Sequence, residues 1–341
     1  MYLRFCGLSE LPFELTPNPR FLFLTDGHRE ALGTLHYGVS SGKSITVLLG
    51  QAGMGKTTLL RTVLESEEYG QVRWVSLNNP ILTREDFLRT LASRFELSAE
   101  AARSKSAFLD ELEGVLRDRR TRGEISVLVV DEAQSLSGEL LEEIRLLANI
   151  ETTTDKLLLL VLAGQPEFAE RLNDPALRPL KQRVTLRCEI TPFDMAETAA
   201  YIASRIATAG GDSARLFTRE AVVAIHECAH GVPRTINVIC DNALLGAFAM
   251  GRPTVDRSVV MDVVADFDLS PEPSAAPAEP PATRETPAAR ETTATRETTA
   301  TREGTALDAP ATAERSAPAS RELFAQISSP RRFAFFGTAR R

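Results

Sequence analysis

The chain has 341 residues, of which 43% are apolar, so it is long enough for two domains and a sizeable buried core. Its longest apolar run, 157–163, is far shorter than the roughly 20 residues of a membrane-spanning helix, and its four cysteines show no C-x-x-C spacing. Since residues 1–14 also lack a charged stretch followed by an apolar one, we expect a cytoplasmic protein with no secretory leader and no membrane span. The formal net charge of −7 gives no reason for strong binding to nucleic acid or anionic lipid.

Short apolar runs alternate with longer amphipathic stretches up to residue 190. The runs predicted to form strands are 44–49, 72–77, 125–130, 157–163 and 184–190, and the stretches with helical spacing between them are 57–65, 84–95, 106–120 and 139–150. This alternation predicts an α/β fold with a parallel sheet covered by helices on both faces. Beyond residue 190 the pattern predicts only helices, at 195–208, 218–230, 234–250 and 257–264.

The composition changes near residue 268. A six-residue repeat follows, with Arg-Glu pairs at 284, 290, 296 and 302, and it buries too little apolar surface to offset the entropy of ordering. Phe333, Phe335 and Phe336 lie among arginines at the end, as either a docking peptide or a frayed terminus. We therefore expect an N-terminal segment that packs on the α/β domain (1–43), the α/β domain (44–190), a helical domain (191–268) and a disordered tail (269–341).

The residues between the first predicted strand and the first predicted helix fit the P-loop pattern at every fixed position: Gly50-Gln51-Ala52-Gly53-Met54-Gly55-Lys56-Thr57. Glycines let backbone amides turn inward around phosphate oxygens, and the N-terminus of the following helix adds partial positive charge. We expect Lys56 to reach the β- and γ-phosphates and the Thr57 hydroxyl to bind Mg²⁺. The expected nucleotide-binding residues are this loop and Thr58.

Two adjacent acids, Asp131 and Glu132, follow the buried strand predicted at 125–130. Asp131 is then placed near the Mg²⁺, and Glu132 is placed where it can orient and deprotonate a water molecule in line with the γ-phosphate. Adjacent acids at the end of a strand are weak evidence for a catalytic site by themselves, since strand ends are usually solvated. Together with the P-loop they favour hydrolysis of a nucleotide over binding alone.

Several segments match one known family: 1–3, 15–21, 28–32, Asp131-Glu132-Ala133-Gln134 and 162–167. Over residues 1 to 268 the chain resembles AAA+ ATPases, and within them the general secretion pathway protein A type. This resemblance implies a P-loop NTPase with a C-terminal helical lid, ATP and Mg²⁺ as ligands, assembly into a homo-oligomer that depends on nucleotide, and an unidentified protein partner. It also implies that the N-terminal segment lies near the adenine base.

The resemblance implies further site residues. Gln165 corresponds to sensor 1, a polar contact to the γ-phosphate or the attacking water, and Arg234 corresponds to sensor 2, an arginine that reaches the phosphates from the helical domain. Asn79 corresponds to the residue that restrains the catalytic glutamate, with Asn78 as the rival assignment. Each role has a simpler alternative: Gln165 could cap the helix that begins at Pro166, and Arg234 could pair with Asp241.

The same resemblance places Arg183 as the arginine finger, which one subunit supplies to the nucleotide of its neighbour. Arg178 is a nearby alternative, and a cation at the end of a helix is the simpler interpretation of Arg183.

A second motif, His226-Glu227-Cys228-Ala229-His230, fits the H-E-x-x-H pattern of zinc sites. Gly231 and Pro233 end the predicted helix directly after it, and no third histidine or later glutamate follows before Glu272. We therefore expect ordinary helix residues here and no metalloprotease site.

The motifs predict an ATP hydrolase, and the resemblance implies that it couples turnover to the remodelling or assembly of a partner. Family members usually continue through a membrane span into a peptidoglycan-binding domain, and this sequence resembles neither. We therefore expect a cytoplasmic accessory of a bacterial secretion, pilus or exopolysaccharide system. The alternative is a DNA-associated ATPase of the transposition or replication-initiation type, and a third class is a nucleotide-gated scaffold without appreciable turnover.

Overall fold

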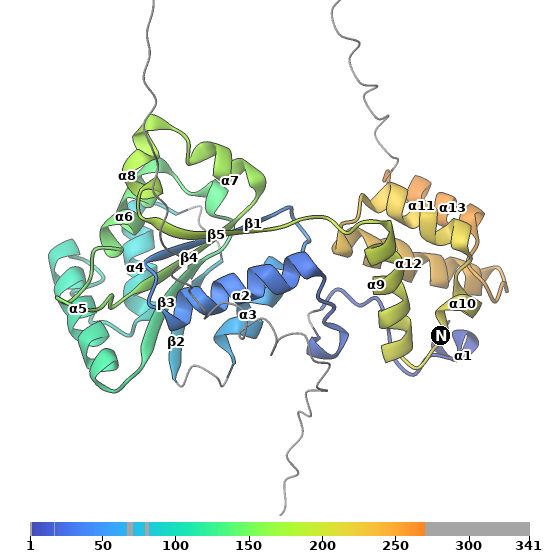
Figure 1. Cartoon of the computed structure of the whole chain (residues 1–341), viewed down its shortest axis with the longest axis horizontal. Helices are drawn as coiled ribbons and strands as arrows, with labels where there is room; N and C mark the ends of the chain where they lie inside the picture. The colour runs from blue at the N-terminus through green and yellow to red at the C-terminus, as the bar shows by residue number, and fades with distance from the viewer. Residues whose placement is uncertain (1, 17, 67–70, 79–81, 270–341) are drawn as a thin grey trace, which may run out of the picture. The chain divides into compact units, whose positions relative to one another are not determined.

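The computed structural model describes residues 2–16, 18–66, 71–78 and 82–269 (Figure 1). Asn79 and the tail from residue 270 onward, including its three terminal phenylalanines, lie outside these ranges, and so do the expectations made for them. Within the described ranges, no helix has the length and apolar character needed to cross a membrane.

Five parallel strands form one sheet, as the sequence pattern predicts, and the structure gives their order as β2-β3-β4-β1-β5. Their bounds are β1 Ile45–Gly50, β2 Val72–Leu77, β3 Ile125–Val130, β4 Leu159–Gly164 and β5 Val184–Ile190. Only β4 begins clearly later than expected. Glu151 and Lys156 form an antiparallel bridge just before it, so Leu157 still belongs to the turn that leads into the strand.

Two apolar layers cover the sheet. On one face Val47, Leu49 and their neighbours pack against helices α4 (Arg84–Arg94), α5 (Lys105–Thr121) and α6 (Gly138–Leu147). On the other face Leu48 packs against α2 (Asp26–Ser40) and α3 (Lys56–Leu64), and Figure 1 shows these two helices running along the sheet. Successive strand residues point to opposite faces, so continuous apolar runs such as β1 and β4 are what a sheet covered on both faces requires.

Side-chain caps define where most of these helices begin. Each capping side chain accepts a hydrogen bond from a backbone amide of the first turn, which would otherwise lack a partner. The capping residues of α2, α4, α5 and α6 are Thr25, Thr83, Ser104 and Ser137. Short helices α7 (Pro166–Arg171) and α8 (Arg178–Lys181) connect β4 to β5, and periodicity did not predict them because neither completes two turns.

The helical domain follows β5 and has its own core. It consists of α9 (Met195–Thr208), α10 (Ser213–Leu216), α11 (Arg219–Ala229), α12 (Pro233–Ala249) and α13 (Arg257–Asp266). Ile206, Ile225 and Ile239 are among the fully buried residues that these helices share. The four longer helices are confirmed to within two residues of their predicted ends, and only the short α10 was not predicted.

The expectation that residues 1–43 pack as one segment on the α/β domain is wrong for its first part. Helix α1 (Tyr2–Cys6) packs against α12, and the Tyr2 hydroxyl donates a 2.5 Å hydrogen bond to Asp241 Oδ1. Further along, Phe13 belongs to the core of the helical domain, and only α2 lies on the sheet, against β5. Apolar residues of α1 are needed to complete that second core, which a local pattern could not reveal.

Candidate nucleotide-binding site

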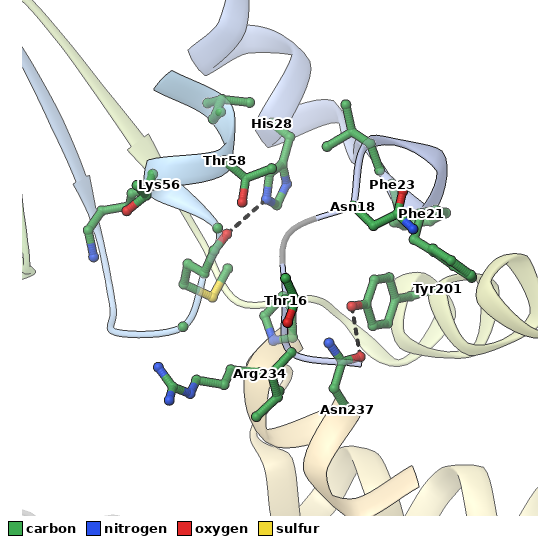
Figure 2. A pocket seen from close by; sticks show the side chains of 18 of the residues that line it. Thr16, Asn18, Phe21, Phe23, His28, Lys56, Thr58, Tyr201, Arg234 and Asn237 are labelled. Carbon is green, nitrogen blue, oxygen red and sulfur yellow. Dashed lines mark hydrogen bonds between the residues drawn. The ribbon is translucent and has the colours of Figure 1, made fainter. Parts of the chain in front are cut away.

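The phosphate loop joins β1 to α3 and is shaped by two glycines with positive φ. Gly53 has φ +82° and Gly55, the N-cap of α3, has φ +87°, a region that other residues rarely adopt. The loop borders a cavity of about 400 Å³ that also reaches the N-terminal segment and the helical domain (Figure 2). The N-terminus of α3 therefore opens into a space where an anion would meet backbone amides.

Lys56 lies inside this loop. Its Nζ donates hydrogen bonds to the carbonyl oxygens of Gly50 at 2.8 Å and Gln51 at 3.1 Å, and its side chain is buried. Burial lowers the pKa of Lys56, while the negative charges of Glu132 and Asp131 act to raise it. The ammonium group is thus held at the loop by carbonyl oxygens, which phosphate oxygens can replace.

The loop meets the end of β3 through one hydrogen bond. Thr57 Oγ1 donates to Asp131 Oδ2 at 2.7 Å, and the other carboxylate oxygen of Asp131 accepts from the backbone amide of Glu132 at 2.9 Å. Thus the two residues predicted to bind Mg²⁺ are in direct contact. A hydroxyl and a carboxylate are oxygen donors of the kind that Mg²⁺ binds, so the pair fits the ion.

Glu132 is held by two amide groups. Its Oε2 accepts hydrogen bonds from Gln134 Nε2 at 2.5 Å and from Gln165 Nε2 at 3.2 Å. Burial alone raises the pKa of Glu132, but these hydrogen bonds and the charge of Lys56 outweigh it and hold the pKa below its usual range. The structure therefore brings the predicted sensor 1 residue and the predicted base together, with the base ionised.

Gln134 is one of the residues of this site that sequence reasoning missed. Its Oε1 accepts a hydrogen bond from the backbone amide of Gln165 at 3.1 Å, while its Nε2 donates to Glu132. The signal was present, because Gln134 ends the Asp131-Glu132-Ala133-Gln134 stretch, but no role was assigned to it. Gln165 is the N-cap of α7, yet its side chain makes no capping hydrogen bond, so the simpler interpretation of Gln165 is wrong.

Arg234 is the second residue of α12 and lies beside the phosphate loop. Its backbone amide donates to the Gly53 carbonyl at 3.3 Å, and a Cβ added to Gly53 would lie 2.7 Å from Arg234 Cβ. Figure 2 shows its side chain extending along the loop side of the cavity, which it lines. The alternative partner Asp241 instead accepts a hydrogen bond from Tyr2, so the predicted Arg234–Asp241 pair is not formed.

Aromatic rings form one end of the cavity, and Figure 2 shows Phe21, Phe23 and Tyr201 on the side opposite Lys56. Phe193 lies 5.2 Å from Tyr201 and 5.9 Å from Phe23 between ring centroids, and Phe21 also lines the space. Flat apolar walls of this kind suit a nucleobase. Thr16, Asn18 and Phe21 line the same cavity, so the N-terminal segment reaches it.

Three other predicted residues, Arg183, Arg178 and Asn78, are not among those that line this cavity. Arg183 directly precedes β5, and the first residue of β5 pairs with Ile45, whereas the loop follows the last residue of β1. At about 3.3 Å per strand residue, Arg183 is about 17 Å from its own loop along the sheet. Arg178 is exposed at the start of α8, and Asn78 accepts a hydrogen bond from Ser76.

The H-E-x-x-H residues make ordinary structural contacts. His226 Nδ1 and Thr198 Oγ1 are 2.9 Å apart, Glu227 pairs with Arg257 at 3.4 Å, and His230 has φ +50° beyond the end of α11. Among the described residues, no cluster of three or more His, Cys, Asp or Glu side chains could hold a metal ion.

The chain is similar in sequence and fold to known proteins. Residues 39–172 match the family model described as "AAA domain". General secretion pathway protein A of Aeromonas hydrophila is 39% identical over 251 residues, which cover 74% of this chain and 46% of that protein. The chain therefore spans less than half the length of this curated relative, and the resemblance inferred from the sequence is confirmed over the matched region.

Solved structures share the fold at lower identity. The ORC2 protein of Aeropyrum pernix, solved in ADPNP and ADP complexes, is 18% identical over 76% of this chain and 72% of that chain, with a TM-score of 0.57. CDC6P of Pyrobaculum aerophilum is 18% identical over 75% and 70%, with a TM-score of 0.57, and Drosophila ORC bound to DNA is 18% identical over 79% and 66%, with a TM-score of 0.59. These similarities support the P-loop AAA+ fold alone.

Proposed function

We propose that this AAA-family relative of general secretion pathway protein A binds ATP with Mg²⁺ at its phosphate loop and hydrolyses it. The observation that carries the proposal is the contact between Thr57 and Asp131, with Glu132 next to it and held by Gln165. A site built only to bind nucleotide has no need of a second, ionised carboxylate beside the first.

Thr57 and Asp131 hold the Mg²⁺, which when bound neutralises charge on the phosphates. Lys56 gives up its carbonyl partners to bind phosphate oxygens, and Arg234 approaches them from the helical domain. Glu132 orients a water molecule and takes its proton, since hydrogen bonds to its charged form keep it ionised at neutral pH. Gln165 binds Glu132 and is close enough to contact the same water.

The charge that develops on the transferred phosphoryl group calls for one more cation. Arg183 is about 17 Å from its own loop along the sheet at 3.3 Å per residue, so it serves the nucleotide of a neighbouring copy in a homo-oligomer. Arg178, which is also exposed and precedes β5, is the rival finger. Hydrolysis then changes the contacts between subunits and between domains, and these changes act on a bound protein partner.

The similarity to general secretion pathway protein A supports an accessory role in a bacterial secretion, pilus or exopolysaccharide system.

Separating binding from turnover tests the proposal. Lys56→Ala removes the charge that meets the phosphates, so ATP affinity should fall by at least tenfold, whereas Glu132→Gln should bind ATP normally and hydrolyse it about 100-fold more slowly. ATP binding is measured by calorimetry and turnover by phosphate release, with and without Mg²⁺. Glu139→Gln, an exposed acid at the start of α6, is the matched control. Equal turnover by wild type and Glu132→Gln would remove Glu132 as the base.

The partner is sought with the same variants. Glu132→Gln saturated with ATP should retain a protein partner that Lys56→Ala does not, because only the first protein holds the ATP-bound state. In a second experiment, ATP hydrolysis is measured with DNA added, which tests the alternative function. Hydrolysis that rises strongly with DNA and loses this stimulation in high salt would support a DNA-associated ATPase instead.

A further inference from the structure

A chain of three buried polar residues ends at the aromatic end of the cavity. Arg205 and Tyr201 come from α9, and Asn237 comes from α12; their exposed fractions are 7%, 5% and 7%. Arg205 Nη1 and Tyr201 Oη are 2.7 Å apart, and Tyr201 Oη and Asn237 Oδ1 are 2.9 Å apart. Within the described ranges Arg205 forms no salt bridge. Its other donors bind the carbonyl oxygens of Pro12 and Glu14.

The directions of these hydrogen bonds are determined by chemistry. An arginine side chain can only donate, so Tyr201 Oη accepts from Arg205, and it donates its own proton to Asn237 Oδ1. That proton remains on Tyr201, because burial raises the pKa of the phenol even though Arg205 and Asn237 oppose the effect. The group of Asn237 that faces Tyr201 is therefore the carbonyl oxygen, and the amide nitrogen Nδ2 points elsewhere.

Nδ2 has no hydrogen-bond partner among the described residues, although Asn237 is nine-tenths buried. Asn237 lines the cavity, and Figure 2 shows its amide nitrogen on the side away from Tyr201. It follows Arg234 by three residues on the same helix, so both side chains lie on one face of α12. Nδ2 is therefore a free hydrogen-bond donor at the wall of the cavity, where a ligand group that accepts a hydrogen bond can bind it.

The position of Asn237 in the cavity indicates which part of the ligand its amide contacts. Lys56 and Thr57 mark the phosphate end, whereas Asn237 is hydrogen-bonded to Tyr201, whose ring belongs to the aromatic end. We propose that Asn237 donates a hydrogen bond from Nδ2 to an acceptor on the nucleoside half of the bound nucleotide, a ring nitrogen of the base or a ribose oxygen. In this arrangement Tyr201 and Arg205 are positioning residues that orient the amide. The inference rests on the proposed function, because it requires nucleotide in this cavity.

Substitution of Asn237 tests the donor. Asn237→Leu should weaken ATP binding about fivefold, which corresponds to about 1 kcal/mol and is typical of one neutral hydrogen bond. Asn237→Asp keeps an acceptor for Tyr201 and replaces the donor with a charged acceptor, so its loss should be greater. Tyr201→Phe keeps the ring and releases the amide, and it should cause a smaller loss. Asn242→Asp, whose native amide donates to the Val238 carbonyl on the same helix, controls for added charge.

Nucleotide analogues identify the acceptor. Binding is measured by calorimetry with ATP, with its 1-, 3- and 7-deaza analogues, and with 2′-deoxy- and 3′-deoxy-ATP. The fivefold difference between wild type and Asn237→Leu should disappear for the one analogue that lacks the accepting atom. A deaza analogue would identify a base nitrogen, and a deoxy analogue a ribose oxygen.

Two results would overturn the inference while leaving the proposed function intact. They are unchanged ATP affinity in both Asn237 variants, and a loss of equal size for every analogue, which would show that the substitution acts through the fold. Melting temperatures of each variant, measured without nucleotide, identify a folding defect directly. If wild-type protein binds no nucleotide at all, the proposed function fails, and this inference fails with it.

Discussion

Glu132 depends on a few hydrogen bonds from neighbouring side chains. It has φ +54°, a conformation that costs free energy for any residue other than glycine, and it accepts from Gln134 and Gln165. Gln134 in turn accepts from the backbone of Gln165. One amide side chain thus connects the end of β3 to the end of β4, and the carboxylate has little freedom to turn away.

Replacing Gln134 should therefore affect the chemical step more than binding. Gln134→Leu removes one donor to Glu132 and leaves the Gln165 amide without its acceptor, and Gln134 does not line the cavity. We expect kcat for ATP hydrolysis to fall about tenfold while KM changes little, which corresponds to about 1.4 kcal/mol in the transition state. Gln71→Leu, at an exposed position, is the control. A rise in KM without a fall in kcat would contradict this role.

His28, which contacts the phosphate loop, should make the stability of the folded protein depend on pH. Its Nδ1 is 2.8 Å from Thr25 Oγ1, its Nε2 is 3.3 Å from the Met54 carbonyl of the phosphate loop, and burial lowers its pKa below the ordinary value. The folded protein therefore holds a neutral imidazole whose Nε2 carries the proton, because a carbonyl oxygen only accepts.

Acid should destabilise the protein through this residue. As the pH falls below the ordinary histidine pKa of about 6.5, the unfolded chain takes up a proton that the folded chain excludes, so stability is lost. We expect the melting temperature of wild type to fall more between pH 7.5 and pH 5.5 than that of His28→Gln, which keeps a donor for Met54. His230→Asn, at an exposed position, should behave like wild type. Parallel pH profiles of wild type and His28→Gln would contradict the assignment.

At the scale of elements, the phosphate loop and the start of α12 are in direct contact. Gly53 lies against Val232 and Arg234, with no room for a Cβ between them. Gly231 behaves in the same way, because a Cβ there would lie 2.1 Å from the Phe193 carbonyl oxygen. Two glycines thus allow the turn between α11 and α12 to approach both the loop and the segment after β5, and this approach brings Arg234 to the cavity.

A Cβ at Gly53 would fill the space between the phosphate loop and the start of α12, and it should push these two elements apart. Gly53→Ala places a Cβ 2.7 Å from Arg234 Cβ and 3.2 Å from Val232 Cγ1, at a backbone φ of +82°. The left-handed conformation alone costs about 1–2 kcal/mol for alanine, so we expect a lower melting temperature and at least tenfold weaker ATP binding. Gly33→Ala in α2, which meets no atom within 4 Å, should leave both unchanged or raise stability slightly. Normal ATP binding by Gly53→Ala would show that the contact is not needed.

At the scale of the whole molecule, the parallel sheet separates Arg183 from its own nucleotide. The arginine precedes β5, and the phosphate loop follows β1 at the opposite end of the paired strands. Under the proposed mechanism a single copy provides Lys56 and Glu132 but not this cation, so turnover would depend on assembly.

Activity per subunit should rise with protein concentration. Arg183→Ala should bind ATP normally and hydrolyse it slowly, because a cation supplied in trans is worth about 10³ to 10⁵ in rate. Adding Lys56→Ala protein, which is inactive but carries Arg183, should partly restore phosphate release, after light scattering has confirmed association. Arg187→Ala on the same strand is the control. Mixed assemblies that show no gain would count against Arg183, and repeating the experiment with Arg178→Ala would test the alternative.

The sequence by itself determined the sheet, the phosphate loop and the acids at the end of β3. Continuous apolar runs, glycine spacing and a strand that ends in two carboxylates are local patterns, and covering both sheet faces leaves few arrangements for them. Only the tertiary structure decided that α1 completes the helical domain and that Gln134 connects Glu132 to Gln165. It also decided the orientation of the Asn237 amide. These contacts join residues distant in the chain, such as Tyr2 and Asp241, and depend on packing geometry that no local pattern encodes.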